Sequence, residues 1–291
     1  MNKILSIVIS SKNNEICLLN LIKQIISNSN FLTSFDLYII NDASTTDYSK
    51  VEEYINKNPE IKYYVNKTPQ GKVRSIVNHT KFLSSQYLVF IDDKDKILPL
   101  FWESIQKLVS NNNVFVGYLA FKNMNIIANK ISSNITYYQY YYLQANEGDL
   151  IFFYPRRIYQ KFSIPIELKN LVINDELVIN QYIFNEPLTI IENLPLIVHD
   201  YSMGHLTKNL FTNKFTNYQL TQWCSYLILK NNPCFVIIIA RLFWLWFTRK
   251  KEKPHFSKIK FRFFYLVLYF SGCFVFIKYL YKRKIENLIK K

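Results

Sequence analysis

The sequence predicts an α/β fold in which helices flank a parallel β-sheet. Short runs rich in β-branched and aromatic residues alternate, over the first 121 residues, with segments whose apolar residues recur at helical spacing. Such alternation is typical of parallel sheets, in which each helix carries the chain back across the sheet. The hydrophobic fraction of 49% excludes an intrinsically disordered chain, and the five glycines and nine prolines exclude a fibrous one.

The individual elements follow from their apolar patterns. Leu5–Ile9 is a β-branched run bounded by polar residues, which predicts a strand buried on both faces. Glu15–Ser27 places leucines and isoleucines at near-helical spacing, which predicts a helix. The same patterns predict strands at 37–40, 62–65, 87–91 and 114–121, and helices at 48–56, 72–83 and 101–109. Asp149–Tyr154 is expected to form a strand that enters a helix, and an amphipathic helix is expected from 173 to 185.

Polar clusters follow three of the first four expected strands. They are Ser10–Asn13, Asn41–Ser44 and Asp92–Asp95. Ligands of open α/β sheets bind beyond the carboxyl ends of the strands. Acidic residues there can bond a nucleobase or ribose, or ligate a divalent metal. The chain has no G-x-G-x-x-G after the first strand and no P-loop motif, which disfavours a dinucleotide oxidoreductase and a P-loop NTPase.

The net charge of +15 belongs entirely to the last 85 residues. Residues 1–206 hold 19 basic and 19 acidic side chains, whereas 207–291 hold 17 basic and two acidic ones. The basic segment is too apolar for a solvated tail, and its charge suggests binding to a membrane or a nucleic acid. The neutral body offers no basic face or recognition module, so no nucleic-acid partner is expected. The four cysteines show no C-x-x-C spacing and indicate reduced thiols facing the cytosol.

Two apolar stretches in the basic segment, 234–247 and 263–277, favour attachment to a membrane. Arg241 interrupts the first, and the second reaches the length of a spanning helix, about 20 residues, only if Lys278 lies within it. Basic residues interleaved with aromatic ones suit a helix in the headgroup layer of an anionic inner leaflet. The alternatives are a helical subdomain on the body, a homodimer interface, and a spanning helix or re-entrant hairpin.

Four motifs in order give the chain a resemblance to the family 2 glycosyltransferases. Ser6–Glu15 is similar to the family's S-V-I-I-P-T-Y-N-x-E, and Ile39–Asp47 to its V-V-D-D-G-S-T-D. Gln70–Arg74 with Asn78 resembles the family's glycine, basic residue and asparagine, and Tyr87–Pro99 resembles Y-x-x-F-L-D-x-D-D-x-x-x-P. The resemblance covers roughly the first 200 residues. It implies the GT-A fold, a Rossmann-like mixed sheet flanked by helices, and inverting transfer from a nucleotide sugar.

The resemblance also implies which residues bind the nucleotide-sugar donor. Asp42 would contact the base, and Lys72 or Arg74 would face the diphosphate, where a basic group is electrostatically favourable. Without the family, Asp42 is explained by an Asx-turn, and the two basic residues by a solvated helix start. The implied donor site consists of Ser10, Lys12, Asn13, Asp42, Gly71, Lys72, Arg74, Asp92, Asp93 and Lys94, with Ser10, Lys12 and Asn13 lining the ribose or base pocket.

The metal motif departs from the family pattern, because Lys94 stands where its second aspartate is usual. A shifted pair, Asp93 and Asp95, would hold Mn²⁺ or Mg²⁺. His199 or His205 would complete the metal shell or contact the diphosphate. Alternatively, the Lys94 ammonium would itself neutralise the donor phosphates and make a metal less important. His199 also opens a stretch similar to the His-Ser-x-Gly of rhamnosyltransferase-like members of the family.

The catalytic base is implied by the segment Ile173–Glu176, which looks like the family's Glu-Asp motif. Asp175 would deprotonate the acceptor hydroxyl from the first turn of a helix, with Glu176 as a substitute. Asn174 replaces the usual glutamate, and helix capping by Asn174 and Asp175 is the structural alternative.

The sequence thus predicts two domains. A GT-A domain is expected at 1–206, with a donor-binding half at 1–121 and an acceptor half at 122–206, followed by a helical membrane-associating extension at 207–291. The expected enzyme transfers a sugar from a UDP- or dTDP-linked donor to a lipid-linked or surface glycan, such as lipopolysaccharide or capsule, at the cytosolic membrane face. A non-catalytic scaffold protein is the alternative, suggested by Lys94 and Asn174.

Overall fold

The computed structural model of the chain describes residues 3–27, 35–108, 113–120, 124–126, 131, 135–140, 150–164 and 182–199. The chain divides into two compact units, Met1–His205 and Leu206–Lys291, and the described residues all lie in the first. The expected base residues Asp175 and Glu176 and the expected extension at 207–291 lie outside the described residues. Within the described ranges, the helices are too short or too polar to cross a membrane.

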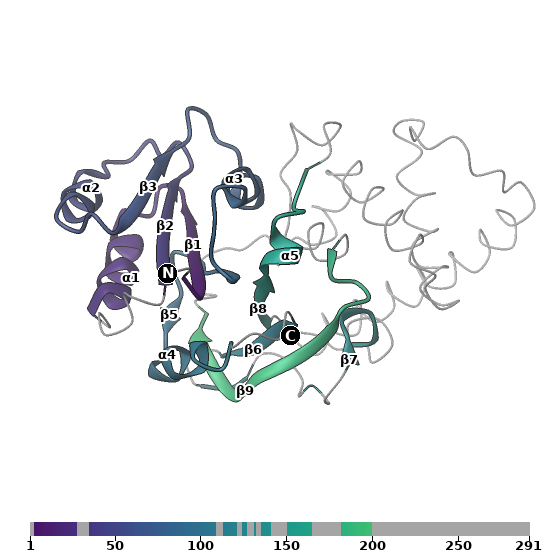
Figure 1. The fold of residues 1–291 in the computed structure, drawn as a ribbon. Helices are drawn as coiled ribbons and strands as arrows, with labels where there is room; N and C mark the ends of the chain where they lie inside the picture. Colours follow the sequence, from purple (N-terminus) through teal and green to yellow (C-terminus); the bar gives the residue numbers. More distant parts are fainter. Residues whose placement is uncertain are drawn as a thin grey trace, which may run out of the picture. The chain divides into compact units, whose positions relative to one another are not determined.

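A mixed nine-stranded sheet is the centre of the described structure (Figure 1). Its strands are β1 (Leu5–Ser11), β2 (Phe35–Asn41), β3 (Ile61–Val65), β4 (Tyr87–Phe90), β5 (Lys96–Ile97), β6 (Val114–Ala120), β7 (Ile135–Thr136), β8 (Leu150–Pro155) and β9 (Pro187–Val198). Their order is β3-β2-β1-β4-β8-β6-β9-β5, with β7 paired to β9. Strands β1 to β4 are parallel, as predicted. Strand β8 lies antiparallel between β4 and β6, so the whole sheet is mixed, as the resemblance implied.

Helices cover both faces of the sheet because successive side chains of a strand point to opposite faces. The described helices are α1 (Glu15–Ser27), α2 (Ser49–Asn56), α3 (Lys72–Thr80), α4 (Pro99–Ile105) and α5 (Arg156–Tyr159). Leu5, Ile7 and Ile9 of β1 share one hydrophobic core with α1, α2 and α4. Helix α3 packs against β1 from the other side, with Val73 and Ile76 buried (Figure 1). The GT-A fold is therefore confirmed for the described part of the chain.

The elements that the sequence did not predict are short or depend on distant partners. Strands β5 and β7 have two residues each, too few to show any periodicity. Strand β9 has 12 residues. It pairs with β5, β6 and β7, so its length is set by neighbours far away in the sequence.

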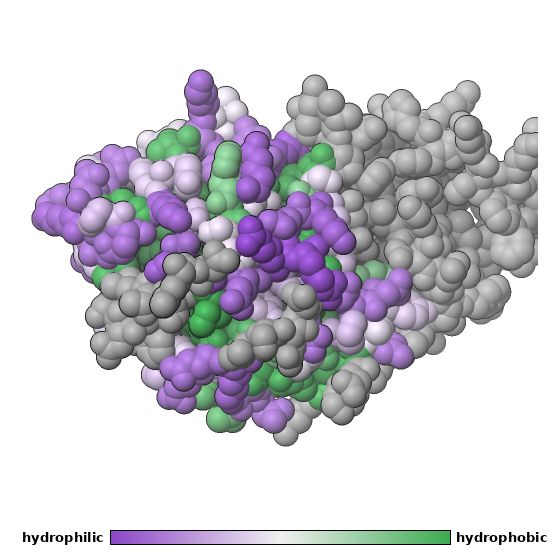
Figure 2. Space-filling model, viewed as in Figure 1, coloured by the Kyte–Doolittle hydropathy of each residue, from purple (hydrophilic) through white to green (hydrophobic). Residues whose placement is uncertain are grey.

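Hydrophilic and hydrophobic residues are mixed over the face shown in Figure 2. The large apolar side chains that are most exposed within the described ranges come from separate elements: Ile16, Val65, Phe82, Met124 and Leu194. Single exposed apolar residues are normal for folded proteins. The polar chemistry of this unit is concentrated elsewhere, at the carboxyl ends of the strands.

Candidate active site

The polar clusters predicted at the strand ends come together in the structure. Parallel pairing aligns Ser11 at the end of β1 with Asn41 at the end of β2. The loops that follow are joined directly, because the Asn13 amide donates to Ser44 Oγ at 3.0 Å. The loop after β4 is joined to β1, because Ser11 Oγ donates to Asp93 Oδ2 at 2.6 Å. The fold therefore builds one site from three segments of the sequence.

Asp42 is buried at the centre of this site, with 3% of its surface exposed. Its Oδ1 accepts hydrogen bonds from Asn66 Nδ2, the Gln70 amide and Ser75 Oγ at 2.7–2.9 Å. Its Oδ2 accepts one from the Gly71 amide at 2.8 Å. Burial alone would raise the pKa of Asp42, but these four donors hold it below its ordinary value. The carboxylate thus fixes the loop that enters α3. Its contact with the nucleobase of the donor stays a prediction.

Two residues near Asp42 adopt the left-handed conformation that favours glycine. They are Asn13, with φ of 55°, and Ala43, with φ of 54°. Asn13 is stabilised there because its Oδ1 accepts the Thr45 amide at 2.7 Å. Ala43 occupies the position of a glycine in the family motif. Asn13 was predicted to line the donor pocket, and the structure shows that its side chain holds the loop after β2.

Asp93 faces β1, where it bonds Ser11. It is separate from the group that Asp92 and Asp95 form with His199. Its partner Ser11 also bonds Tyr48 OH at 2.8 Å, which ties the turn to the residue preceding α2. Burial raises the pKa of Asp93, and the Ser11 hydrogen bond and the Lys94 charge oppose this only in part. Ser11 and Tyr48 were missed in the sequence, where the adjacent Ser10 was selected and Tyr48 was taken as the first residue of a helix.

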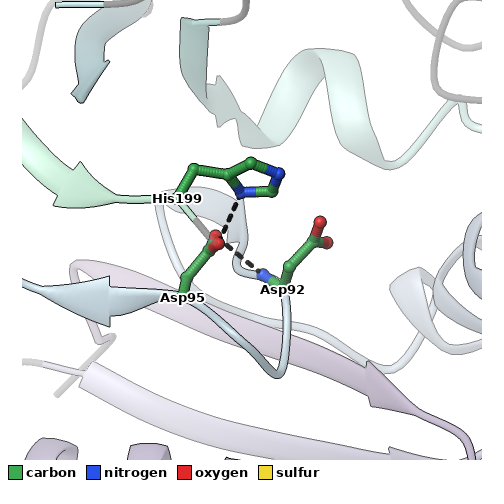
Figure 3. A group of neighbouring side chains, drawn as sticks. All are labelled: Asp92, Asp95 and His199. Carbon is green, nitrogen blue, oxygen red and sulfur yellow. Dashed lines mark hydrogen bonds and ion pairs between the residues drawn. The ribbon is translucent and has the colours of Figure 1, made fainter. Parts of the chain in front are cut away.

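A second group brings together Asp92, Asp95 and His199 (Figure 3). One potential ligand atom from each lies within 4.8 Å of the others. Pairing explains this geometry: β5 and β9 align Lys96 with Val198, so the next pair outward is Asp95 and His199. Asp95 Oδ1 lies 2.5 Å from His199 Nδ1. The predicted members Asp95 and His199 are therefore adjacent, and Asp92 stands with them where Asp93 was expected.

The Asp95 side chain supports this group from behind. Only 6% of it is exposed. While Oδ1 bonds His199, Oδ2 accepts the Asp92 amide at 3.2 Å. Burial raises the pKa of Asp95, an effect that the hydrogen bond from His199 opposes. A carboxylate that bonds one nitrogen of an imidazole fixes the ring so that the other nitrogen can face a metal.

Gln24 of α1 holds β5 in register, a role that the sequence gave no sign of. Its Nε2 donates to the Ile97 carbonyl oxygen at 2.6 Å, and its Oε1 accepts the Ile97 amide at 3.1 Å. The side-chain amide therefore pairs with the backbone of β5 as a neighbouring strand would. Because Ile97 lies two residues from Asp95, the hydrogen bonds between Gln24 and Ile97 also help to hold Asp95 beside His199.

The basic residues expected near the diphosphate lie at the start of α3. Lys72 forms an ion pair with Asp92, and each side chain is 35% exposed. The preceding residue, Gly71, has φ of 80° and donates its amide to Asp42. Burial lowers the pKa of Arg74, one turn of helix from Gly71. Ser10 and Lys94 are partly buried, and Lys12 is exposed.

The chemistry of the Asp92–Asp95–His199 group fits a divalent metal. Carboxylate oxygens suit Mg²⁺ and Mn²⁺, and imidazole is a common additional ligand. Figure 3 shows the second ring nitrogen of His199 pointing away from Asp95, toward the side where the Asp92 carboxylate lies. Asp92 and His199 are thus placed to contact an ion, and Asp95 is placed to orient His199.

Comparisons with known proteins agree with this description. The sequence model described as glycosyl transferase family 2 matches residues 6–164. No curated protein matches the sequence significantly. A structure of S. aureus TarS 1–349 in complex with UDP-GlcNAc is 13% identical, with a TM-score of 0.62 over 92% of this chain and 79% of that one. The mannosyltransferase PcManGT from Pyrobaculum calidifontis, in complex with GDP-Man and Mn²⁺, is 9% identical, with a TM-score of 0.53 over 86% and 74%. At these identities the structures establish a shared fold.

Proposed function

Because the chain belongs to glycosyl transferase family 2, we propose that it is an inverting enzyme that transfers a sugar from a UDP- or dTDP-linked donor to a glycan hydroxyl. The observation that carries this proposal is the grouping of Asp92, Asp95 and His199 beside Lys72, at the carboxyl ends of the strands. Transfer from a nucleotide sugar releases a nucleoside diphosphate, and such a leaving group needs positive charge beside it.

The described residues supply that charge in two ways. Lys72 contributes an ammonium at the start of α3. Asp92 and His199 would hold Mn²⁺ or Mg²⁺, which would stabilise the charge that develops on the departing diphosphate. Two structural neighbours were solved with nucleotide sugars, one of them with Mn²⁺, which supports this assignment. This scheme does not need the motif aspartate that Lys94 replaces, since Asp92 is positioned within the group.

The acceptor hydroxyl requires a general base, and we assign this role to Asp175, with Glu176 as its substitute. The assignment comes from the sequence motif, since both residues lie outside the described part of the chain. The base removes the hydroxyl proton while the oxygen attacks the anomeric carbon from the side opposite the diphosphate, which inverts the configuration.

The acceptor and the location are proposed from the sequence. The basic, aromatic residues of 207–291 suit the inner leaflet of the cell membrane, so a lipid-linked or surface glycan is the proposed acceptor. We assign the protein a peripheral or monotopic position there, and a homodimer is compatible with the same segment. Rhamnose is one candidate for the transferred sugar, because of the stretch that begins at His199, and hexoses are the other.

A transfer assay with a panel of nucleotide sugars, Mn²⁺ and membrane glycolipid extract tests the activity. We expect Asp175→Asn to lower the turnover by about 10²–10⁴-fold, the range typical of a lost general base. We expect His199→Ala to abolish the response to Mn²⁺. The matched control is Asp47→Asn, an exposed aspartate whose carboxylate accepts hydrogen bonds from the nearby Ser49. Full activity in both site variants would refute the site assignment.

A non-catalytic binding or scaffold protein is the second candidate, because Lys94 and Asn174 replace two acidic residues of the family motifs. Calorimetry with UDP- and dTDP-sugars, with and without Mn²⁺, separates the two candidates. Binding without hydrolysis or transfer of any donor would favour the scaffold.

A further inference from the structure

Lys72 and the proposed cation share one carboxylate. Lys72 Nζ forms an ion pair with Asp92 Oδ1. The same aspartate belongs to the Asp92–Asp95–His199 group, whose ligand atoms lie within 4.8 Å of one another. A metal held by Asp92 and His199 would therefore stand next to the Lys72 ammonium. Two positive charges at contact distance repel each other, and they compete for the negative charge of one carboxylate.

We propose that Lys72 is an exchangeable counter-ion of Asp92, which moves to the donor diphosphate when the nucleotide sugar binds and so makes cation binding depend on the donor. The inference rests on the proposed function, because it assumes that a diphosphate binds beside α3. In the unliganded site Lys72 satisfies Asp92. In the complex Lys72 pairs with the diphosphate, and Asp92 binds the cation.

The structure allows such an exchange because the backbone at Lys72 is fixed and its side chain is not enclosed. Gly71 is held by its hydrogen bond to Asp42. The Ser75 amide donates to the Gly71 carbonyl at 3.0 Å, which closes the first turn of α3. The Lys72 side chain is 35% exposed, and a lysine stem has four rotatable bonds. Its ammonium can therefore change partners without movement of the helix.

The exchange predicts that replacing Lys72 changes the affinities for the cation and for the nucleotide in opposite directions. In Lys72→Gln the competing ammonium is gone, so Mn²⁺ alone should bind more tightly than to the wild type. The same variant lacks the charge that faces the diphosphate, so UDP or dTDP alone should bind more weakly. Couplings between sites in proteins typically change affinities about 5–150-fold, and we expect changes of about tenfold in each direction. A residue with only a structural role would weaken the binding of both ligands.

The experiment is a calorimetric titration of the full-length protein in detergent with Mn²⁺, with UDP or dTDP, and with each in the presence of the other. Lys72→Arg keeps the positive charge and should behave like the wild type. The matched control is Lys67→Gln, which removes one exposed lysine from the loop before α3. Because an exposed charge is screened by salt, we expect it to change either affinity by less than about twofold.

Three outcomes are distinguishable. Tighter Mn²⁺ binding together with weaker nucleotide binding in Lys72→Gln supports the exchange. Unchanged or weaker Mn²⁺ binding in that variant, with normal binding of both ligands to the wild type, overturns the exchange and leaves the proposed function standing. A wild type that binds neither nucleotide, with or without Mn²⁺, contradicts the proposed donor class itself.

Discussion

Replacing Asp42 by asparagine tests the claim that this carboxylate builds the site. The change keeps the shape of the side chain but leaves only one oxygen. If that oxygen stays at the Oδ1 position, it still accepts from Asn66, Gln70 and Ser75. The new side-chain NH₂ group then faces the backbone amide of Gly71. Two donors therefore meet where the wild type has a 2.8 Å hydrogen bond.

The expected loss of stability follows from these contacts. Leaving the Gly71 amide without its acceptor costs about 1–3 kcal/mol. The three remaining hydrogen bonds are no longer made to a negatively charged group, which lowers the stability by about 1 kcal/mol for each bond. Because contributions of neighbouring bonds are not additive, we expect a total of about 3 kcal/mol or somewhat more. For a folded unit of this size that lowers Tm by about 6–12 °C.

The assay is thermal unfolding of the full-length protein at pH 7 and at lower pH, followed by fluorescence, with Asp47→Asn as the exposed control. Since the pKa of Asp42 is held below its ordinary value of 3.8, its contribution is complete above that value. It is lost as the pH falls through the lower pKa of the folded state. The difference in Tm between wild type and Asp42→Asn should therefore shrink in acid. A Tm of Asp42→Asn within 2 °C of the wild type at pH 7, or a difference independent of pH, would refute the reasoning.

Three further variants test other local features. Ala43→Gly should raise the stability by about 0.5–1 kcal/mol in denaturant titrations, because it relieves a left-handed conformation with φ of 54° at the expense of a more flexible unfolded chain; a loss would contradict this. Gly71→Ala should cost about 1–3 kcal/mol, because its φ is 80° although no atom lies within 4 Å of the added methyl group; unchanged unfolding would speak against the strain. Gln24→Leu should destabilise the protein by about 1–3 kcal/mol and weaken Mn²⁺ binding, because both bonds to Ile97 are lost; lowered stability with unchanged Mn²⁺ affinity would show that β5 does not transmit the effect.

The sequence predicted the parallel part of the fold well, because each of its strands carries its own signal. The helix expected at Glu15–Ser27 is α1, and the strand expected from Leu5 is β1. The strand ends then placed the polar clusters, since parallel strands bring their carboxyl ends to one edge. Local sequence patterns were sufficient to predict these strands and helices, because each element carries its own pattern.

The arrangement of the acidic turn could not be predicted in the same way. Asp95 and His199 are 104 residues apart and meet through a strand of two residues. Within the turn, the Asp95 amide donates to the Asp92 carbonyl at 3.0 Å, which closes a tight turn. The turn brings its first and fourth residues together and directs Asp93 to Ser11. A sequence shows three nearby carboxylates, but only the backbone geometry determines which two share a side.

The same geometry shows which of the predicted site residues also bond the protein's own loops. Asp42 and Asn13 matched the motif as donor-binding residues, yet their oxygens accept hydrogen bonds from the protein's own loops. Asp92 and Lys72 form a partly exposed ion pair at the edge of the metal group, a contact that a ligand can replace. A carboxylate surrounded by four protein donors contributes mainly to stability, because removing it leaves those donors unsatisfied. An ion pair between two partly exposed side chains contributes little to stability. Because Lys72 can be replaced there by a cation, we expect the negative charge of Asp92 to matter more for binding than for folding.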